Sequence, residues 1–166
     1  MELRFISTEY TVRKLNDKDI DKVYELCKKN TIFYRYHPPF VTKESIIEDM
    51  YALPPNKSYD DKFYLGFFKN NILIALMDVI RDYPCANVIF IGLFMIDATF
   101  QGQGIGTKII RESCSYWKNL KYRKVQLGVD KGNPHSNAFW QKNAFVIIGE
   151  KRSTDTHEYL LMERTL

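Results

Sequence analysis

The sequence contains, at its centre, the stretch Ile96-Asp97-Ala98-Thr99-Phe100-Gln101-Gly102-Gln103-Gly104-Ile105-Gly106-Thr107. An apolar run over residues 88–96 leads into it, and a helical pattern over residues 105–117 follows it. Glycine has no Cβ atom, so three glycines at alternate positions allow a sharp turn and a close approach of a ligand to the backbone amides. The start of the helix adds unpaired N–H groups and the positive end of the helix dipole. The stretch therefore predicts a site for an anion, most often phosphate, with a plain strand-to-helix turn as the alternative.

Length and composition limit the classes of protein to which the chain can belong. Its 166 residues suffice for one domain, residues 1–166, with a sizeable core. The formal net charge of +4 suits an anionic ligand. The basic residues form no dense stripe, so the charge does not indicate nucleic-acid binding. The three cysteines and three histidines are scattered, which predicts a reducing cytoplasm and no metal site. No apolar run has the length of a membrane span, and the first residues do not resemble a signal peptide.

Hydrophobic periodicity predicts a mixed α/β chain. Strands are expected at residues 10–15, 63–68, 72–80, 88–96, 124–129, 145–151 and 158–164, with residues 3–6 extending or flanking the first. Helices are expected after a cap at Asn16 or Asp17, and at residues 42–52, 105–117 and 134–143. Residues 30–40 are expected to form an aromatic loop, because prolines interrupt a regular helix. Hairpin turns are expected at Asn70-Asn71 and across residues 152–156. Hairpin-linked strands followed by a strand–helix–strand unit predict a mixed sheet, with strand 88–96 central.

Two motifs resemble the signatures of the GNAT superfamily of N-acetyltransferases. Gln101-Gly102-Gln103-Gly104-Ile105-Gly106 looks like the family's Gln/Arg-x-x-Gly-x-Gly/Ala signature. The stretch from Asn133 to Phe145 resembles the second signature, which has an Asn, an aromatic pair, a Lys and then Gly-Phe. The element order also matches the family fold over most of the chain. A dinucleotide-binding fingerprint fits less well, because its glycines are spaced differently.

The resemblance implies a fold and a donor. The fold would be α/β (α+β): a mixed, strongly twisted six- to seven-stranded sheet flanked by about four helices, with splayed central strands. The donor would be acetyl-CoA, whose pyrophosphate the backbone N–H groups of the glycine turn would surround. The preceding strand would pair with the pantetheine arm as with an added strand. The residues expected at the donor are Phe94, Ile96, Gln101, Gly102, Gln103, Gly104, Ile105, Gly106, Thr107, Asn133, Ser136, Phe139 and Trp140.

Three positions within this resemblance need separate interpretations. Asn133 matches the family asparagine near the pantetheine amides, but it is equally suited to cap the following helix. Trp140 stands where many relatives have a tyrosine acid; an indole only donates from N–H, so we expect it to contact the thioester rather than to protonate the thiolate. The thiolate is a fair leaving group without full protonation, since a thiol pKa is ~8.5. Ala144 replaces the family glycine, so we expect a slightly different turn there.

The general base is not evident from the sequence. Strand 88–96 contains no ionisable side chain, although an amine must lose a proton to attack. Candidates near the expected cleft are Asp78, Asp82, His37 and Tyr83, or a chain of water molecules without a dedicated residue. Of these, Asp82 and Tyr83 are the expected catalytic side chains together with Trp140.

The resemblance further implies a primary amine as acceptor. Residues 33–40, the helix 42–52 and the loop 82–87 are expected to form its pocket. The candidate contacts are Tyr34, Tyr36, His37, Asp82 and Tyr83. The aromatic side chains favour an amine with apolar or aromatic parts, and Asp82 would attract a cation. Polyamines, aminoglycosides, amino acids and protein N-termini all remain open.

We therefore expect a cytoplasmic N-acetyltransferase, monomeric or homodimeric. The acceptor would attack the thioester directly in a ternary complex, with the carbonyl polarised by a backbone N–H such as that of Ile96. One alternative is a non-catalytic module that senses acyl-CoA. Another is an RNA-associated or ribosomal role, for example as a protein-modifying enzyme, which would show salt-dependent binding.

Overall fold

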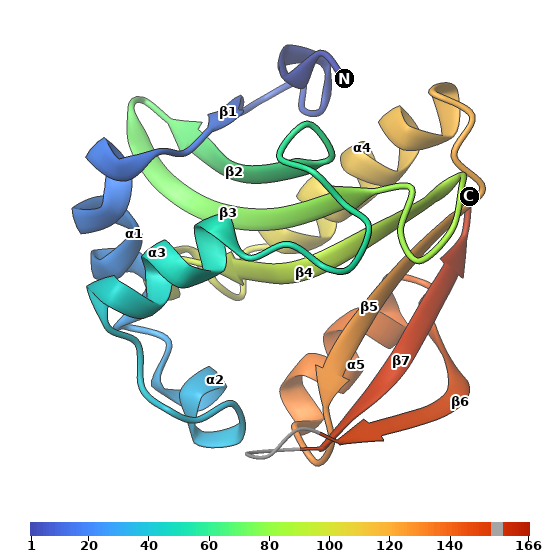
Figure 1. The fold of residues 1–166 in the computed structure, drawn as a ribbon. Coiled ribbons are helices and arrows are strands. Elements are labelled where there is room, and N and C mark those ends of the chain that lie inside the picture. Colours follow the sequence, from blue (N-terminus) through green and yellow to red (C-terminus); the bar gives the residue numbers. More distant parts are fainter. Residues whose placement is uncertain (154–157) are drawn as a thin grey trace.

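One mixed β-sheet organises the molecule (Figure 1). The computed structural model describes residues 1–153 and 158–166, and within them seven strands lie in the order β1-β2-β3-β4-β5-β7-β6. Neighbouring strands are antiparallel except β4 and β5, which are parallel. The mixed, twisted sheet expected from the sequence is confirmed. The strands are β1 (Thr11–Lys14), β2 (Lys62–Lys69), β3 (Ile72–Arg81), β4 (Val88–Ile96), β5 (Lys124–Asp130), β6 (Val146–Ser153) and β7 (Glu158–Thr165).

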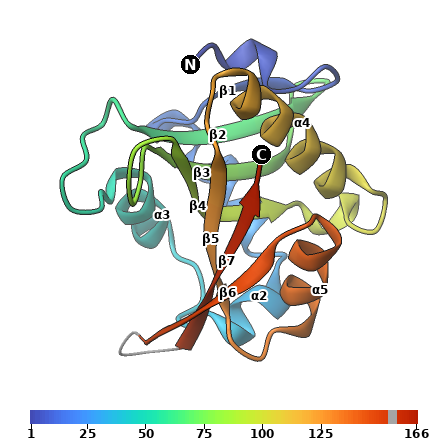
Figure 2. The same ribbon diagram turned by 90° about the vertical axis from the view of Figure 1, so that its right-hand side faces the viewer.

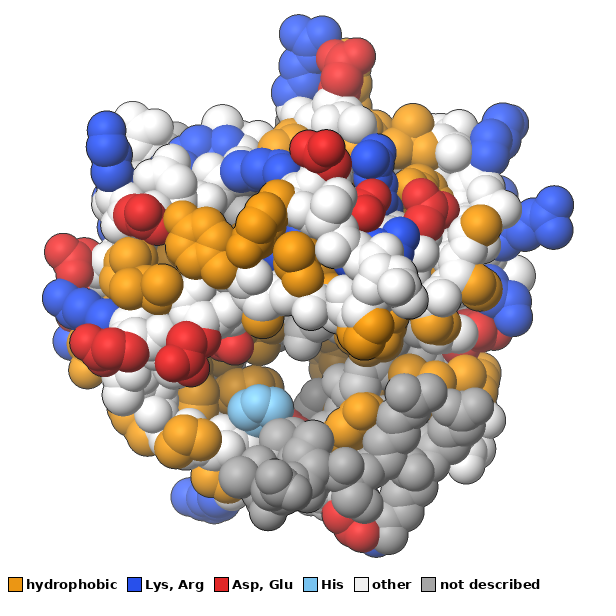
Figure 3. Space-filling view, in the orientation of Figure 1, with side chains coloured by type: hydrophobic (Ala, Val, Ile, Leu, Met, Phe, Trp, Pro, Cys, Tyr) orange, Lys and Arg blue, Asp and Glu red, His pale blue; other side chains and the backbone are white. Residues whose placement is uncertain are grey.

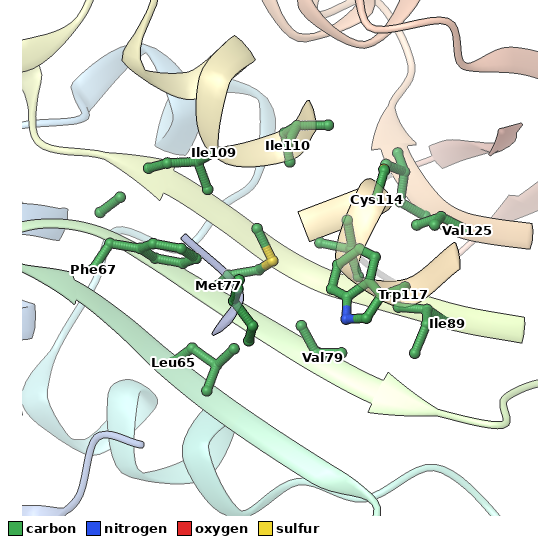
Figure 4. Close-up of a cluster of buried hydrophobic side chains, with 14 of the residues drawn as sticks. Leu65, Phe67, Met77, Val79, Ile89, Ile109, Ile110, Cys114, Trp117 and Val125 are labelled. Atoms are coloured by element: carbon green, nitrogen blue, oxygen red, sulfur yellow. The ribbon is translucent and has the colours of Figure 1, made fainter. Parts of the chain in front are cut away.

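Helices cover both faces of the sheet, as Figure 2 shows edge-on. They are α1 (Ile20–Cys27), α2 (Thr31–Tyr36), α3 (Lys43–Tyr51), α4 (Ile105–Asn119) and α5 (Pro134–Lys142). On one face, α4 buries Ile109 and Trp117 in a cluster with Met77 and Val79 of β3 (Figure 4). On the other face, α1 and α3 enclose a second cluster against β2, β3 and β4. Every helix expected from periodicity is present.

Two segments near the N-terminus differ from the expectation. Residues 31–36 form the short helix α2, although residues 30–40 were expected to be an aromatic loop. The prolines at 38 and 39 exclude a longer helix, but they lie beyond its last turn and do not disturb the six residues before them. Residues 3–5 form a 3-10 turn and not a strand.

Local signals for turns and caps are largely confirmed. Asn70 and Asn71 both have positive φ, 49° and 64°, as a tight hairpin between β2 and β3 requires. Thr42 caps α3, since its side chain accepts a hydrogen bond from the Ser45 N–H at 3.1 Å. Ala144 has φ 64°, the left-handed conformation that glycine adopts at lower cost. Part of the turn expected across 152–156 lies outside the described residues.

The central strands separate, as expected for splayed strands. β4 and β5 pair only over Val88–Ile91 and Lys124–Leu127, although both continue further. The bulge between β3 and β4 falls at the same level: Val79 pairs with Ile91 and Asp78 with Leu93, so Gly92 is the extra residue. Figure 3 shows a hollow below the centre of this face, where the two strands diverge in Figure 1. We call this V-shaped gap between β4 and β5 the split.

Candidate functional site

The glycine turn lies at the end of β4, beside the split. Gly102 and Gly104 have φ of 74° and 77°, and Gly104 is the residue directly before α4. A Cβ at either position would meet nothing within 4 Å, so conformation and not space requires glycine there. A Cβ on Gly106 would instead lie 3.1 Å from the Phe139 ring. The three glycines therefore have two different functions: two make the turn, and the third lets α5 approach α4.

Side chains from the end of α1 hold the turn in place. The Asp97 carboxylate caps the short 3-10 helix after β4 through the Thr99 N–H at 2.9 Å, and it pairs with Lys29 at 2.9 Å. Burial opposes ionisation of Asp97, but the bonds from Lys29 and Thr99 lower its pKa. Asn30 is buried, and its Nδ2 donates to the Ile96 carbonyl at 3.2 Å. These contacts tie the start of the turn to the segment that follows α1.

Gln101, expected at the pyrophosphate, directs its side chain inward. Its Nε2 donates to Asn30 Oδ1 at 2.7 Å and to the Ile96 carbonyl at 3.0 Å. The carbonyl of Ile96 therefore accepts two side-chain donors. The backbone of residues 101–107 still borders the start of α4, where an anion is favoured by the helix N-terminus.

A pocket of 260 Å³ lies next to the glycine turn. Lys69 from the end of β2 and Lys108 from the first turns of α4 line it together with Gln103 and Gly104. Lys108 forms an ion pair with Glu9. Glu9 also lines the pocket and offsets the charge of Lys108, so the pocket adds mainly the Lys69 cation to the backbone donors of the turn.

Aromatic rings of β4 and α5 pack against one another. Phe94 of β4 stacks on Phe139 of α5, with ring centroids 5.9 Å apart, and lies at the same distance from Trp140. Trp140 is buried. Asn133 caps α5, because its Oδ1 accepts from the Ser136 N–H at 3.1 Å. The structure thus brings the expected donor residues of β4, the glycine turn and α5 to one place, while their contacts with a ligand stay predictions.

The candidate acceptor residues separate into two groups. Tyr34 and His37 lie on and directly after α2, and His37 Nδ1 lies 3.0 Å from Oδ1 of Asp130, at the end of β5. Burial raises the pKa of Tyr34. Tyr36 is the last residue of α2. Tyr34 packs against the cluster under α1 and α3, on the face of the sheet opposite α4, and His37 reaches the end of β5.

Asp82 and Tyr83 lie elsewhere. They are in the loop before β4, where the Tyr83 N–H donates to the Val88 carbonyl at 3.2 Å. Asp82 accepts from the Asn87 N–H at 2.8 Å and so stabilises that loop. The split begins after Ile91, about 10 Å further along the strand at ~3.3 Å per residue. The structure does not bring these two residues together with the glycine turn, and their catalytic role stays a prediction.

A buried ion pair beside the split joins Asp78, a candidate base from the sequence, to Lys62, which the sequence does not indicate. Lys62 of β2 is nearly inaccessible, and its Nζ lies 2.9 Å from Oδ2 of Asp78 on β3. Burial raises the pKa of Asp78, against the attraction of Lys62. A lysine at a strand start ordinarily indicates the surface. Asn30 was also missed, since only the folded chain places it against β4 and the glycine turn.

Within residues 1–153 and 158–166, no three His, Cys, Asp or Glu side chains gather as a metal site would require. In the same part of the chain, no helix combines the length and the apolar composition needed to cross a bilayer.

Comparison with known proteins identifies similar sequences and folds. A family model described as "Acetyltransferase (GNAT) family" matches residues 21–145. No curated protein sequence matches the chain significantly. Among solved structures, the ribosomal L7/L12 alpha-N-protein acetyltransferase RimL superposes with a TM-score of 0.74 at 19% identity, covering 97% of this chain and 92% of that one.

Two further structures are similar over nearly their whole length. An acetyltransferase from Thermus thermophilus has a TM-score of 0.73 at 18% identity, with 95% of this chain and 97% of that chain covered. PaiA N-acetyltransferase from Thermoplasma acidophilum, solved in complex with coenzyme A, has a TM-score of 0.67 at 19% identity, with 95% and 99% covered. At these identities the likeness concerns the fold.

Proposed function

Because the chain belongs to the acetyltransferase (GNAT) family, whose members carry out acyl transfer, we propose that it moves an acetyl group from acetyl-CoA to a primary amine. The observation that carries the proposal is the position of the glycine turn directly at the open end of the split. The turn offers backbone donors to phosphates, and the split offers an unpaired strand side to an extended arm. Few ligands besides an acyl-CoA combine those two requirements.

The donor would lie along the inner side of the split. Its pyrophosphate would contact the backbone of residues 101–107, with Lys69 and Lys108 near its charged end. The pantetheine arm would run beside Leu93–Ile96, where β4 keeps β3 as neighbour but has already lost β5. Binding in this way extends the sheet with main-chain hydrogen bonds. The thioester would then reach the point where the strands diverge.

Reaction would follow by direct attack of the amine on the thioester carbon. Holding both reactants in the split supplies orientation, which is worth several kcal/mol of the barrier. Trp140 has no proton to give as an acid, so its ring would pack against the thioester end of the donor. The thiolate can leave as such, since a thiol pKa is ~8.5.

The acceptor would enter from the α2 side. His37 and the rings of α2 border that opening, and Asp130 lies at its far wall. RimL, the structure with the highest TM-score given above, is by its name an alpha-N-protein acetyltransferase. A protein or peptide amine is therefore included among the acceptors to be tested, beside small amines.

The test is a thiol-release assay with acetyl-CoA and four acceptor classes: spermidine, an aminoglycoside, free amino acids, and short peptides with a free N-terminus. We expect amine-dependent release with one class. Tight binding of acetyl-CoA by calorimetry without release for any class would instead support the non-catalytic acyl-CoA sensor. Absence of both binding and release would refute the proposal.

A further inference from the structure

Asp78 occupies the level at which the split begins. It lies on β3 opposite Leu93, at the bulge that makes Gly92 an extra residue of β4. Its Oδ2 lies only 2.7 Å from the position that a Cβ on Gly92 would take. Gly92 is exposed and follows Ile91, the last residue of β4 that pairs with β5. The carboxylate therefore lies beside Gly92, at the point of β4 that the thioester of a donor in the split would reach.

The carboxylate is on the side from which the acceptor would come. Its neighbours Met77 and Val79 point into the cluster under α4, the face of the glycine turn. Side chains alternate along a strand, so Asp78 faces the opposite side, with Leu76 and the cluster under α1 and α3. Donor and carboxylate would thus approach the same point of β4 from opposite faces.

The two oxygens of Asp78 have different surroundings. Oδ2 accepts from Lys62 Nζ and is the oxygen nearest to Gly92, whereas Oδ1 is buried and has no hydrogen-bond partner in the part of the chain that the structure describes. The side chain keeps 14% exposure. The other ionisable groups that act on it are Asp49 of α3 and the Tyr64 phenol of β2, while β4 presents only Gly92 and apolar side chains there.

Burial raises the pKa of Asp78 despite the ion pair. A carboxylate with a raised pKa is a better proton acceptor than an ordinary surface aspartate, because base strength improves as the pKa approaches the working pH. Partial desolvation also raises the pKa of Asp49, whose residue remains exposed to solvent. Asp49 also acts on Asp78 as a second carboxylate and raises its pKa further.

We propose that Asp78 is the general base of the reaction, and that Lys62 is the positioning residue that holds it. The proposal rests on the acetyl transfer proposed above. An ammonium acceptor would give one proton to Asp78 and become a neutral amine. The amine nitrogen then bonds to the thioester carbon, the C–S bond breaks, and the thiolate takes the second proton. Asp78 finally returns its proton to solvent.

A matched pair of probe amines tests this assignment: 2-phenylethylamine and 2,2-difluoro-2-phenylethylamine. The fluorines withdraw electrons and lower the amine pKa with little change of shape. For Asp78→Asn at pH 7, we expect kcat/KM to fall by about 10²–10⁴-fold with the first amine. We expect a fall of less than about 10-fold with the second, which arrives largely neutral and needs little of the help that a base supplies. Equal losses with both amines, or none, would overturn the proposal.

Two other variants keep the carboxylate in the chain. Lys62→Met should move the acid limb of the pH profile of kcat/KM to higher pH, because it removes the cation that favours ionised Asp78. Gly92→Ala should displace the carboxylate and lower kcat while acetyl-CoA binding is kept. Asp19→Asn, which removes a buried carboxylate from an ion pair with Arg13 far from the split, is the matched control and should leave the profile unchanged.

A titration without turnover separates this proposal from the general function. Carbon-13 NMR of aspartate-labelled protein, compared with Asp78→Asn, would give the Asp78 signal directly. We expect it to titrate above an ordinary aspartate and to shift when acetyl-CoA is added. If the Asp78 signal titrates like that of an ordinary aspartate and does not shift when acetyl-CoA is added, the assignment is overturned, even if the wild type releases thiol. Wild-type protein that binds acetyl-CoA but acetylates no amine counts against the enzyme itself, whatever Asp78 does.

Discussion

Replacing Gly104 by glutamate would place a negative charge where we propose that the phosphates bind. Gly104 has φ 77°, so any L side chain there costs about 1–2 kcal/mol of folding free energy. That cost is common to alanine, glutamine and glutamate. A Cβ at this position would meet no atom within 4 Å, and glutamine and glutamate have the same size and shape beyond it. The comparison of Gly104→Glu with Gly104→Gln therefore isolates the charge.

The expected size of the effect follows from Coulomb's law. Two unit charges about 6 Å apart interact by about 1.4 kcal/mol at an effective dielectric of about 40, between water and protein surface. A pyrophosphate with two charges would lose about 2.8 kcal/mol, which is about 100-fold in Kd. Salt screens part of this repulsion, so about 10- to 100-fold is expected at physiological ionic strength.

Calorimetry with acetyl-CoA is the assay, on wild type, Gly104→Ala, Gly104→Gln and Gly104→Glu, each checked for folding by circular dichroism. The gap between the glutamine and glutamate variants should narrow as sodium chloride is raised. If the two bind acetyl-CoA within about twofold of each other at low salt, the phosphates do not lie at this turn. The donor site would then have to be placed elsewhere on the chain.

Three further predictions concern stability. Gly106→Ala should cost about 1 kcal/mol or more in thermal unfolding, because its Cβ would crowd the Phe139 ring at 3.1 Å, and the cost should vanish in a Phe139→Ala background. Ala144→Gly should stabilise the chain by about 0.5–1 kcal/mol in urea, since it relieves a left-handed alanine; a loss would contradict this. Asp19→Asn should cost about 1–3 kcal/mol at pH 7. The hydrogen bonds from Arg13 lower the Asp19 pKa, so this contribution is present above the unfolded-state pKa of ~3.9 and is lost as pH falls through the lower folded value. The stabilities of the two proteins should converge over that fall in pH.

Features that depend on neighbours in sequence are the ones that the sequence predicts well. The positive φ values of Gly102 and Gly104, the caps at Thr42 and Asn133, and the hairpin at Asn70 all follow from local backbone chemistry. A short run of residues decides each of them. The position of the glycine turn at the start of α4 was accordingly predictable to the residue.

Features that depend on a cross-strand neighbour are not visible in the sequence. In the sequence, Gly92 only weakens the strand propensity of an apolar run. The structure explains the glycine, because a Cβ there would clash with the Asp78 carboxylate of the neighbouring strand β3. Lys62 is buried only because that same carboxylate compensates its charge. Asn30 reads as a loop residue until the fold brings it to Ile96.

The loop at Asp82 illustrates a different limit. β4 has a loop at each end, and both contain polar and aromatic residues that fit a site. Which end opens into the split depends on where β5 leaves β4, and this is a matter of pairing register. The hydrophobic periodicity of a single strand does not show with which residues of another strand it pairs. Candidate residues were therefore expected at both ends.

The seam between β4 and β5 consists of only four residue pairs, between two antiparallel parts of the sheet. A ligand hydrogen-bonded along the split would occupy the place of the missing partner strand and tie the two parts together. We expect it to slow hydrogen exchange at the amides of Leu93–Ile96 and to make thermal unfolding more cooperative. Without the ligand, only these four pairs join the two parts through the sheet. The fewer such pairs there are, the more a bound ligand can add to the cooperativity of unfolding.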